Sequence, residues 1–495
     1  MKQKRTIVVG SGAGGLSLAL LLARAGRQVT VIESQPEIGG YLRRFTREGI
    51  RFDTGFHFSG GYTNIMSMIL HVLGLDDASR ANAIPNRIIL ENTGNDLTIP
   101  AGCGFRGAET VMCDCFEKDA PALHRLFDAI DAVWKSTPMC DLRDLTPLKM
   151  EISPGDLQSV TDFYRSIGMG PIAGGAAGSF AMCHGSLLSE AALSFHARVG
   201  YAIFDDLARP VGGGDPIIAG FKREAAKLGI ELRTGTTLLP FSEMNADGEC
   251  TTVCLSDGSA IEADQVFFTN HPLAVCELLP EKARTPSLCR RIRRFRDSTS
   301  FFCSYYVIDE GTPVTPGLVS YFTSHDLDAI LTGTDGAYST GYLLEREADL
   351  QGKMRSVIAA FRTMPPGSPD WAAPTRALRR EDAAYQAFKE KMTADIASDL
   401  EKIYPEFKEH LHPAAAGSPL TCRDYDPPTG SAYGVRNVCA FSRLFGRLPV
   451  RNFFIAGQSA LVPGVMGTML CSFSVFRQAV GEETYCRLIR ESGIC

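Results

Sequence analysis

The first thirty-three residues alternate between apolar runs and short glycine-rich or polar breaks. Residues 6–9 form a mostly apolar run whose length suits a buried strand, and residues 16–25 form a longer run that suits a buried helix. A third run, residues 28–32, ends at the carboxylate of Glu33. The pattern predicts a strand, a turn, a helix and a second, parallel strand.

Glycines fill the break between the first predicted strand and the helix: Gly10, Gly12, Gly14 and Gly15. In dinucleotide-binding folds such glycines permit the tight turn, let a pyrophosphate approach the backbone, and let the helix pack closely on the sheet. The phosphates lie on the helix N-terminus, where unpaired N–H groups favour negative charge. Glu33 lies about 20 residues past the turn, where a carboxylate accepts hydrogen bonds from ribose hydroxyls. These features predict a dinucleotide site that prefers a 2′-hydroxyl to a 2′-phosphate.

The same stretch has a competing interpretation as a secretory signal. Lys4 and Arg5 precede an apolar run that ends near Ala25, as a signal's basic and apolar regions do. The glycines inside the run and the strand predicted after it argue against a signal.

Later apolar patterns predict further elements of the same kind. Helical spacing covers residues 63–75, 119–134, 158–167, 216–228 and 467–480, and strand-like runs cover residues 230–233, 236–241, 251–255, 260–262, 263–270 and 452–457. Residues 49–61 alternate between apolar and polar, which predicts a strand with His57 near its end. Further strands and helices of the nucleotide-binding fold are therefore expected in the middle and near the C-terminus of the chain.

Residues 168–181 differ from the rest because they are rich in Gly, Ala, Pro and Ser and carry no charge. A flexible lid, a membrane-facing loop and a tightly packed buried backbone all suit this composition. The sequence leaves the three open.

Composition narrows the class of protein. A chain of 495 residues is too long for one compact core, so two domains are expected. The net charge of −6 gives no electrostatic reason to expect nucleic acid, and no stretch is apolar enough for a convincing bilayer span, although peripheral membrane contact stays open. The 15 cysteines are scattered and match no zinc or iron-sulfur spacing. We expect no metal and a cytoplasmic protein, with membrane association as the alternative left open.

Together these segments resemble the FAD-dependent superfamily of phytoene desaturases, carotenoid isomerases and retinol saturases. The resemblance rests on segments that recur in the family's order: residues 9–15, Ile38-Gly39-Gly40 with Arg43, Phe52-Asp53-Thr54-Gly55, Ala263-Asp264, Ser431-Ala432-Tyr433-Gly434, and Ala456-Gly457 with Pro463-Gly464. It implies an α/β fold with a doubly wound, discontinuous FAD-binding Rossmann-like domain (residues 1–75, 205–285 and 436–495). An α+β substrate domain would comprise residues 76–204 and 286–435. Details around His57 and after Gly457 are more similar to the retinol saturase branch.

The resemblance also implies which residues hold FAD. The ADP half would contact Gly10, Gly12, Ala13, Gly14, Gly15 and Glu33, with Gly40 and Arg43 by the pyrophosphate and flavin and Leu238 over adenine. Gly457, Val465 and Met466 would meet the ribityl chain and flavin O2, where a helix N-terminus stabilises negative charge. Gln458 departs from the family, which often has aspartate there; an amide still bonds ribityl hydroxyls but supplies no charge.

His57 is the first catalytic candidate, because the ordinary pKa of histidine lies near working pH, and Tyr433 is the second. Asp53 is expected to brace the local backbone through its side chain. Aromatic residues cluster on two strand-like runs, where they suit either a sheet core, which we favour, or an apolar tunnel: Phe301, Phe302, Tyr305, Tyr306, Tyr321 and Phe322.

The expected function is FAD-dependent saturation, desaturation or isomerisation of carbon-carbon double bonds in a lipophilic isoprenoid or polyene. An amine-oxidase or protoporphyrinogen-oxidase type of enzyme and a non-catalytic FAD-binding lipid carrier are the alternatives. A nicotinamide dehydrogenase is disfavoured, because a single Rossmann unit does not need the additional strand and helix predicted near the C-terminus. The sequence does not identify the electron donor or acceptor.

Overall fold

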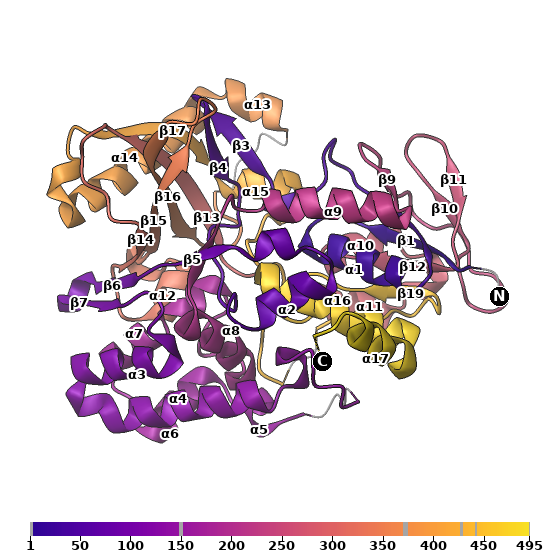
Figure 1. The fold of residues 1–495 in the computed structure, drawn as a ribbon, viewed down its shortest axis with the longest axis horizontal. Helices are drawn as coiled ribbons and strands as arrows, with labels where there is room; N and C mark the ends of the chain where they lie inside the picture. The colour runs from indigo at the N-terminus through magenta and orange to yellow at the C-terminus, as the bar shows by residue number, and fades with distance from the viewer. Residues whose placement is uncertain (1–2, 148–151, 370–374, 426–428, 441–442, 495) are drawn as a thin grey trace.

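The computed structural model describes residues 3–147, 152–369, 375–425, 429–440 and 443–494. Figure 1 shows two sheets set apart from one another, with a group of helices below the second sheet. Long apolar strands and amphipathic helices of the predicted kinds build both parts. The α/β class expected from the sequence is confirmed.

The first sheet is the predicted Rossmann-like sheet. Its strands lie in the order β18 (Gly446–Arg447), β19 (Phe453–Ile455), β12 (Gln265–Phe268), β1 (Arg5–Val9), β2 (Gln28–Ile32) and β9 (Glu231–Arg233). All neighbours are parallel except β18 and β19. The first, middle and last parts of the chain therefore pair side by side.

Helices cover both faces of this sheet, because alternate strand residues point to opposite sides. Val8 and Phe267 face one core with α1 (Ala13–Arg24), α2 (Ile65–Val72), α9 (Asp215–Leu228), α16 (Gly464–Val480) and α17 (Glu482–Glu491). Ile7 and Phe268 face another core with α10 (Pro272–Leu278), α11 (Pro286–Arg293) and the hairpin β10 (Thr252–Cys254) and β11 (Ala260–Glu262). The sheet is thus doubly wound, as expected.

The second sheet is mixed and has seven strands. Their order is β17 (Leu411–Gly417), β13 (Ser300–Ile308), β16 (Met354–Met364), β15 (Ser339–Ala348), β14 (Gly317–Phe322), β6 (Asn86–Leu90) and β7 (Asn95–Ile99), with only β14 and β6 parallel. One face packs on α14 (Ala383–Ile403), and the other packs on the hairpin β3 (Arg44–Arg47) and β4 (Ile50–Asp53). Short helices α12 (Leu327–Thr332), α13 (Arg376–Glu381) and α15 (Pro419–Tyr425) complete this part.

The chain after β7 forms a group of helices that build a separate apolar core. They are α3 (Gly104–Cys115), α4 (Ala120–Lys135), α6 (Val160–Ile167), α7 (Pro171–Ala177) and α8 (Leu193–Asp205). The short α5 (Pro154–Leu157) has no buried residue. A two-strand pair, β5 (Ala81–Ala83) with β8 (Ala208–Pro210), joins the start and the end of this segment. The domain boundaries inferred from the resemblance stay a prediction.

Two sequence-based expectations are corrected, and one question that the sequence left open is answered. The strand predicted over 49–61 ends at Asp53, so His57 lies in the loop beyond it. Residues 236–241 form no strand, only an isolated bridge between Leu238 and Leu255. Residues 168–181 are neither lid nor membrane loop: they form α7 and a short 3₁₀ helix, where a Cβ at Gly175 would lie 2.5 Å from the carbonyl oxygen of His325. Tight packing of this backbone required the small residues.

Candidate functional site

In the glycine turn after β1, some glycines are required by close packing or backbone conformation, and another faces open space. A Cβ at Gly15 would collide with the carbonyl oxygen of Gly10, so only glycine lets α1 lie this close to the strand. Gly10 itself has φ of +96°, a conformation that favours glycine. Around Gly12, in contrast, no heavy atom of the described residues, apart from Gly12 and its two chain neighbours, lies within 4 Å of where a Cβ would be. Gly12 thus faces open space at the N-terminus of α1.

Three distant parts of the chain meet at this turn. Ser472 of α16 donates a hydrogen bond from Oγ to the carbonyl oxygen of Gly14, at 2.9 Å. A Cβ at Gly14 would lie 2.8 Å from Thr468, and one at Gly457 would lie 2.6 Å from the carbonyl oxygen of Thr269. Early, middle and late segments therefore close around one space, with glycine at each close approach.

We call that space the glycine-lined cavity. It has an empty volume of about 1700 Å³ and runs from the end of β2 to the start of α16. Eleven of the residues proposed from the sequence line it: Gly10, Gly12, Ala13, Gly14, Glu33, Gly40, Leu238, Tyr433, Gly457, Gln458 and Val465. Gly15 lies behind the turn, where its role is packing.

Glu33 is held at the end of β2 with its carboxylate toward the turn. One oxygen accepts hydrogen bonds from the backbone N–H and the hydroxyl of Ser11, at 2.9 and 2.5 Å. The other accepts from the backbone N–H of Gln35, at 2.8 Å. That oxygen also accepts a longer bond from the hydroxyl of Ser34, at 3.2 Å. The four bonds fix the carboxylate at the wall of the glycine-lined cavity and use its four lone-pair sites, so a ligand hydroxyl would replace the long bond from Ser34.

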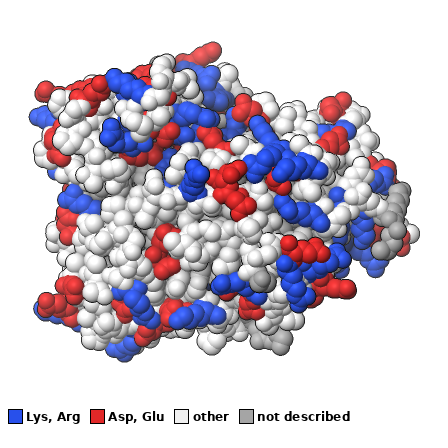
Figure 2. All heavy atoms as spheres, viewed as in Figure 1, with Lys and Arg blue, Asp and Glu red and all other residues white. Residues whose placement is uncertain are grey.

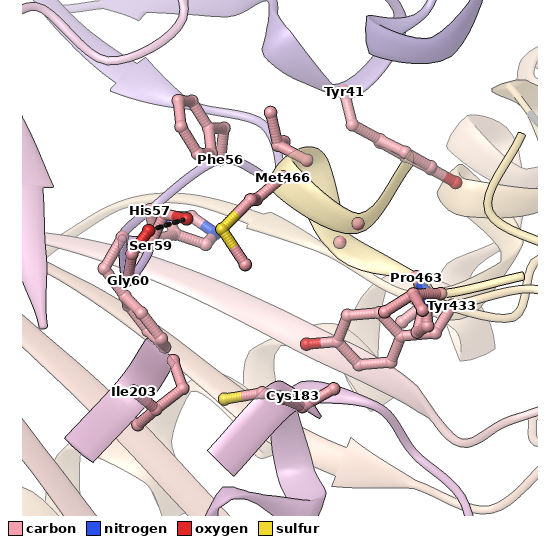
Figure 3. Close-up of a pocket in the computed structure, with 18 of the residues that line it drawn as sticks. Tyr41, Phe56, His57, Ser59, Gly60, Cys183, Ile203, Tyr433, Pro463 and Met466 are labelled. Carbon is pink, nitrogen blue, oxygen red and sulfur yellow. Dashed lines mark hydrogen bonds between the residues drawn. The ribbon is translucent and has the colours of Figure 1, made fainter. Parts of the chain in front are cut away.

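A second space, the apolar cavity, adjoins the first. It has an empty volume of about 1130 Å³ and is lined by loop 54–60, α8, β13, β16 and the start of α16 (Figure 3). Six residues line both cavities: Tyr41, Gly55, Ala432, Tyr433, Gly464 and Val465. The junction therefore lies at the N-terminus of α16. Met466, expected at the cofactor, instead lines only the apolar cavity.

His57 lines the apolar cavity but is not poised for acid catalysis as an imidazolium. Its ring stacks on Phe361 with 5.1 Å between centroids. Burial, assisted by the positive charge of Arg209, lowers the pKa of His57 to about 3. The expectation of a pKa near working pH is wrong, because sequence cannot reveal this enclosure.

Tyr433 occupies the junction itself. Figure 3 shows its hydroxyl directed into the apolar cavity. No described residue forms a hydrogen bond with that hydroxyl, and burial raises the pKa of Tyr433 well above its ordinary value. The phenol thus stays protonated over the whole physiological range, with its O–H available to a ligand.

Neither Arg43, expected by the pyrophosphate and flavin, nor its neighbour Arg44 lines the glycine-lined cavity. Arg43 instead forms an ion pair with Glu37, at 3.0 Å. Arg44, which has the appearance of a surface charge, is buried, with Nε 3.0 Å from Oδ1 of Asp53. Arg43 has an extended backbone just before β3 begins at Arg44, and successive residues of an extended chain point to opposite sides, which explains the difference.

Asp53 lies at the centre of a buried ion-pair network. Arg209 contacts its other oxygen at 2.7 Å and also pairs with Glu345, while Arg44 also pairs with Glu347. Burial raises the pKa of the Asp53 carboxyl to about 7, and the charges of Arg209 and Arg44 oppose the rise. The expected bracing through local backbone N–H groups is wrong: Asp53 holds β4 to β8 and β15 through arginines.

Two polar residues of the glycine-lined cavity escaped the sequence reasoning. Thr269 donates a hydrogen bond to the carbonyl oxygen of Val9, at 2.8 Å, and contacts both Gly10 and Gly457. Asn270 follows it, and its buried Oδ1 has no hydrogen-bond partner among the described residues. Their position past the carboxyl end of a parallel strand was an available signal, because ligands of such sheets bind there.

The clustered aromatics are mainly core, as favoured from the sequence. Phe302, Tyr306, Tyr321 and Phe322 are buried in the cores on either side of the second sheet, and the hydroxyl of Tyr305 bonds the carbonyl oxygen of Asp53. Phe301 alone of the six lines the apolar cavity. Successive strand residues point to opposite faces of a sheet, so Phe301 points away from the core that contains Phe302.

The described residues contain no group of three or more His, Cys, Asp or Glu side chains able to hold a metal ion. None of their helices combines the length and apolar character that crossing a bilayer requires. Basic and acidic side chains are interspersed over the face drawn in Figure 2. The expectations about nucleic acid, membrane contact and location stay predictions.

Comparison with known proteins agrees with this geometry. Residues 8–71 match the model of an NAD(P)-binding Rossmann-like domain. The chain is 22% identical to human all-trans-retinol 13,14-reductase over 533 aligned positions, covering 95% of this chain and 85% of the relative. It is 25% identical to phytoene desaturase of Fusarium fujikuroi, covering 58% and 53%. The chain is thus a distant homologue of both, along its full length in the first case.

Among solved structures, a triple mutant of putrescine oxidase superimposes with a TM-score of 0.64 and 15% identity, covering 96% of this chain and 98% of the other. At this identity the likeness concerns the fold: a Rossmann-like sheet joined to a separate mixed sheet. The resemblance found in the sequence is confirmed at the level of distant homology and fold.

Proposed function

We propose that this protein is an FAD-dependent oxidoreductase that acts on carbon-carbon double bonds of a lipophilic isoprenoid or polyene. The observation that carries the proposal is the junction of the two cavities at Tyr433 and Val465. A dinucleotide-sized space there opens directly onto a space with an apolar lining. The distant relationship to a retinol reductase and a phytoene desaturase supports the same chemistry.

The residues present fit FAD. The N-termini of α1 and α16 both border the glycine-lined cavity, and neither helix has a side-chain cap on its first N–H groups. Those groups suit a pyrophosphate and an electron-rich flavin oxygen. Gly12 leaves room for phosphate, Glu33 suits the ribose hydroxyls, and Leu238 suits adenine. We assign residues 1–75, 205–285 and 436–495 to the cofactor domain on this basis.

When bound, the flavin supplies hydride transfer to or from carbon. The chain's own residues supply the rest. Tyr433 holds a proton at Oη on the apolar side of the junction, where saturation of a double bond needs a donor. His57, Phe361 and Phe301 form an apolar wall that orients a long chain and excludes water. Met466 closes the wall beside Gly61. We favour saturation, because a protonated phenol suits that direction and the full-length relative is a reductase.

The amine-oxidase alternative is disfavoured by charge. Among the described residues that line the apolar cavity, Arg198 is the only one with a charged side chain. Its guanidinium repels a protonated amine. The fold likeness to putrescine oxidase does not bear on substrate.

The test is anaerobic spectroscopy of the purified protein. We expect a bound flavin that dithionite bleaches and that all-trans-retinol or another polyene reoxidises, with a product two hydrogens heavier by mass spectrometry. Bleaching of oxidised flavin by the lipid would indicate desaturation instead. A flavin spectrum that no lipid changes would support the carrier, and a colourless protein would overturn the proposal.

A further inference from the structure

Arg198 brings a single positive charge to the apolar cavity. It lies on α8, whose residues 198, 199, 202 and 203 all line the cavity and form one stripe of the helix surface. The other described lining residues are apolar, aromatic, thiol, hydroxyl or backbone groups, together with His57, whose lowered pKa keeps it neutral. A charge in such a lining is costly without a partner.

The structure provides Arg198 with only a neutral partner. Its Nε donates a hydrogen bond to Oγ1 of Thr137, at 3.1 Å. No carboxylate of the described residues comes within the 4.0 Å that defines an ion pair with it. Asp156, whose pKa the charge of Arg198 helps to lower, is already bonded to Ser153 and Ser194. Both terminal nitrogens of the guanidinium are therefore left for a ligand.

Arg198 is partly exposed, and three arginines with buried side chains show the partner that it lacks. Arg209, Arg44 and Arg362 each lie within 3.0 Å of a carboxylate oxygen. The fold thus neutralises these three arginines with carboxylates, but not the one at the apolar cavity. The edge formed by the two terminal nitrogens of a planar guanidinium matches a carboxylate, which it binds through two parallel hydrogen bonds.

We propose that the lipophilic substrate carries a carboxylate, which forms an ion pair with Arg198 while its apolar chain extends across the cavity to the junction at Tyr433. This inference rests on the proposed function in one respect only, that the apolar cavity is the substrate site. Arg198 is then a specificity-determining residue: it selects long-chain acids over alcohols and hydrocarbons of the same shape.

The test compares ligands that differ only in the head group. Binding of retinoate and retinol, and of hexadecanoate and hexadecanol, is measured by calorimetry on the purified holoprotein, in wild type and in Arg198→Gln and Arg198→Lys variants. Arg125→Gln, an exposed arginine of α4 outside the cavity, is the matched control. We expect each acid to bind wild type at least about tenfold more tightly than its alcohol, as a charge-assisted pair provides.

In Arg198→Gln the acids should lose that advantage while the alcohols bind unchanged, and Arg198→Lys should restore part of it. The Arg125→Gln variant should match wild type. Equal affinity for acid and alcohol in wild type, an advantage that survives in Arg198→Gln, or no binding of any of the four ligands would overturn the inference. Because the readout is binding, an acid preference without flavin chemistry would reject the proposed function and retain this inference; flavin chemistry without the preference would do the reverse.

Discussion

Arg209 lies 2.7 Å from Asp53 although both side chains are more than nine-tenths buried. The pair joins the end of β4 to β8, and Glu345 extends it to the second sheet. Loop 54–60, which begins directly after Asp53, lines the apolar cavity. The ion pair therefore fixes one wall of that cavity.

Replacing Asp53 by alanine should lower the free energy of unfolding by about 3–5 kcal/mol, because Arg209 and Arg44 would lose a buried counter-charge. Urea unfolding monitored by circular dichroism measures the loss. Glu37→Ala provides the control, since it breaks an ion pair in which Glu37 is 70% exposed, and should cost less than about 1 kcal/mol. Similar losses in both variants would contradict a structural role for the buried network.

Gly12→Ala and Gly15→Ala should separate cofactor binding from folding. At Gly12 an added methyl group meets no protein atom but enters the glycine-lined cavity, so the variant should fold normally and bind FAD at least about tenfold more weakly. At Gly15 the methyl group meets the carbonyl oxygen of Gly10, so the apoprotein should lose roughly 1–3 kcal/mol of stability or more. Flavin titration and urea unfolding provide the two readouts. An unstable Gly12→Ala apoprotein would show that this position is structural too.

Tyr433→Phe should lower the turnover number by about a hundredfold or more with flavin content unchanged, as expected when a positioned proton donor is lost. Single-turnover reduction of a polyene by the photoreduced protein measures the step. Wild-type rates in the phenylalanine variant would remove the hydroxyl from the reaction.

The pH dependence of the same step should show no contribution from His57. Its pKa of about 3 keeps the imidazole neutral throughout the range from pH 5 to pH 8. Rate profiles of wild type and His57→Gln should therefore have the same shape over that range, whatever their absolute values. A step near pH 6.5 that disappears in His57→Gln would show that the ring titrates during catalysis.

Acid should destabilise the fold through two other histidines. His184 accepts a hydrogen bond at Nδ1 from the backbone N–H of Ser186, so its Nε2 carries the proton and donates to Nδ1 of His196, at 2.9 Å. Burial lowers the pKa of both rings, that of His184 to about 3. Unfolded histidines bind protons below about pH 6.5, so stability is complete above that pH and falls as pH drops toward 3.

Urea unfolding between pH 4 and pH 8 measures this slope. The double variant His184→Leu with His196→Leu should have a shallower decline below pH 6.5, even if its stability at pH 8 is lower. An unchanged slope would assign the acid sensitivity to other groups.

The sequence predicted most fully what depends on near neighbours. Residues 6–33 contain their own strand, turn and helix signals, so β1, α1 and β2 could be placed, and the long apolar run of α16 was equally legible. Arg43 and Arg44, by contrast, are adjacent and alike in sequence. Their different partners follow from strand direction and from Glu37, Asp53 and Glu347, which local patterns do not bring together.

The environment of His57 was hidden for the same reason. Its low pKa depends on Arg209, 152 positions away, and on enclosure by loops that no periodicity describes. Arg198 was equally hidden, because its lack of a carboxylate partner is a property of the assembled helices. Residue patterns therefore did not predict the chemistry that depends on contacts between distant parts of the chain.

The hydrogen bond from Ser472 to Gly14 has a consequence for biosynthesis. The ribosome makes the glycine loop 458 positions before Ser472 of α16, the helix that completes the pocket. At about 5–20 residues per second, roughly 20 to 90 s separate the two. The nascent chain therefore cannot complete this pocket before α16 has emerged, and termination upstream of α16 would release a polypeptide that lacks one wall of it.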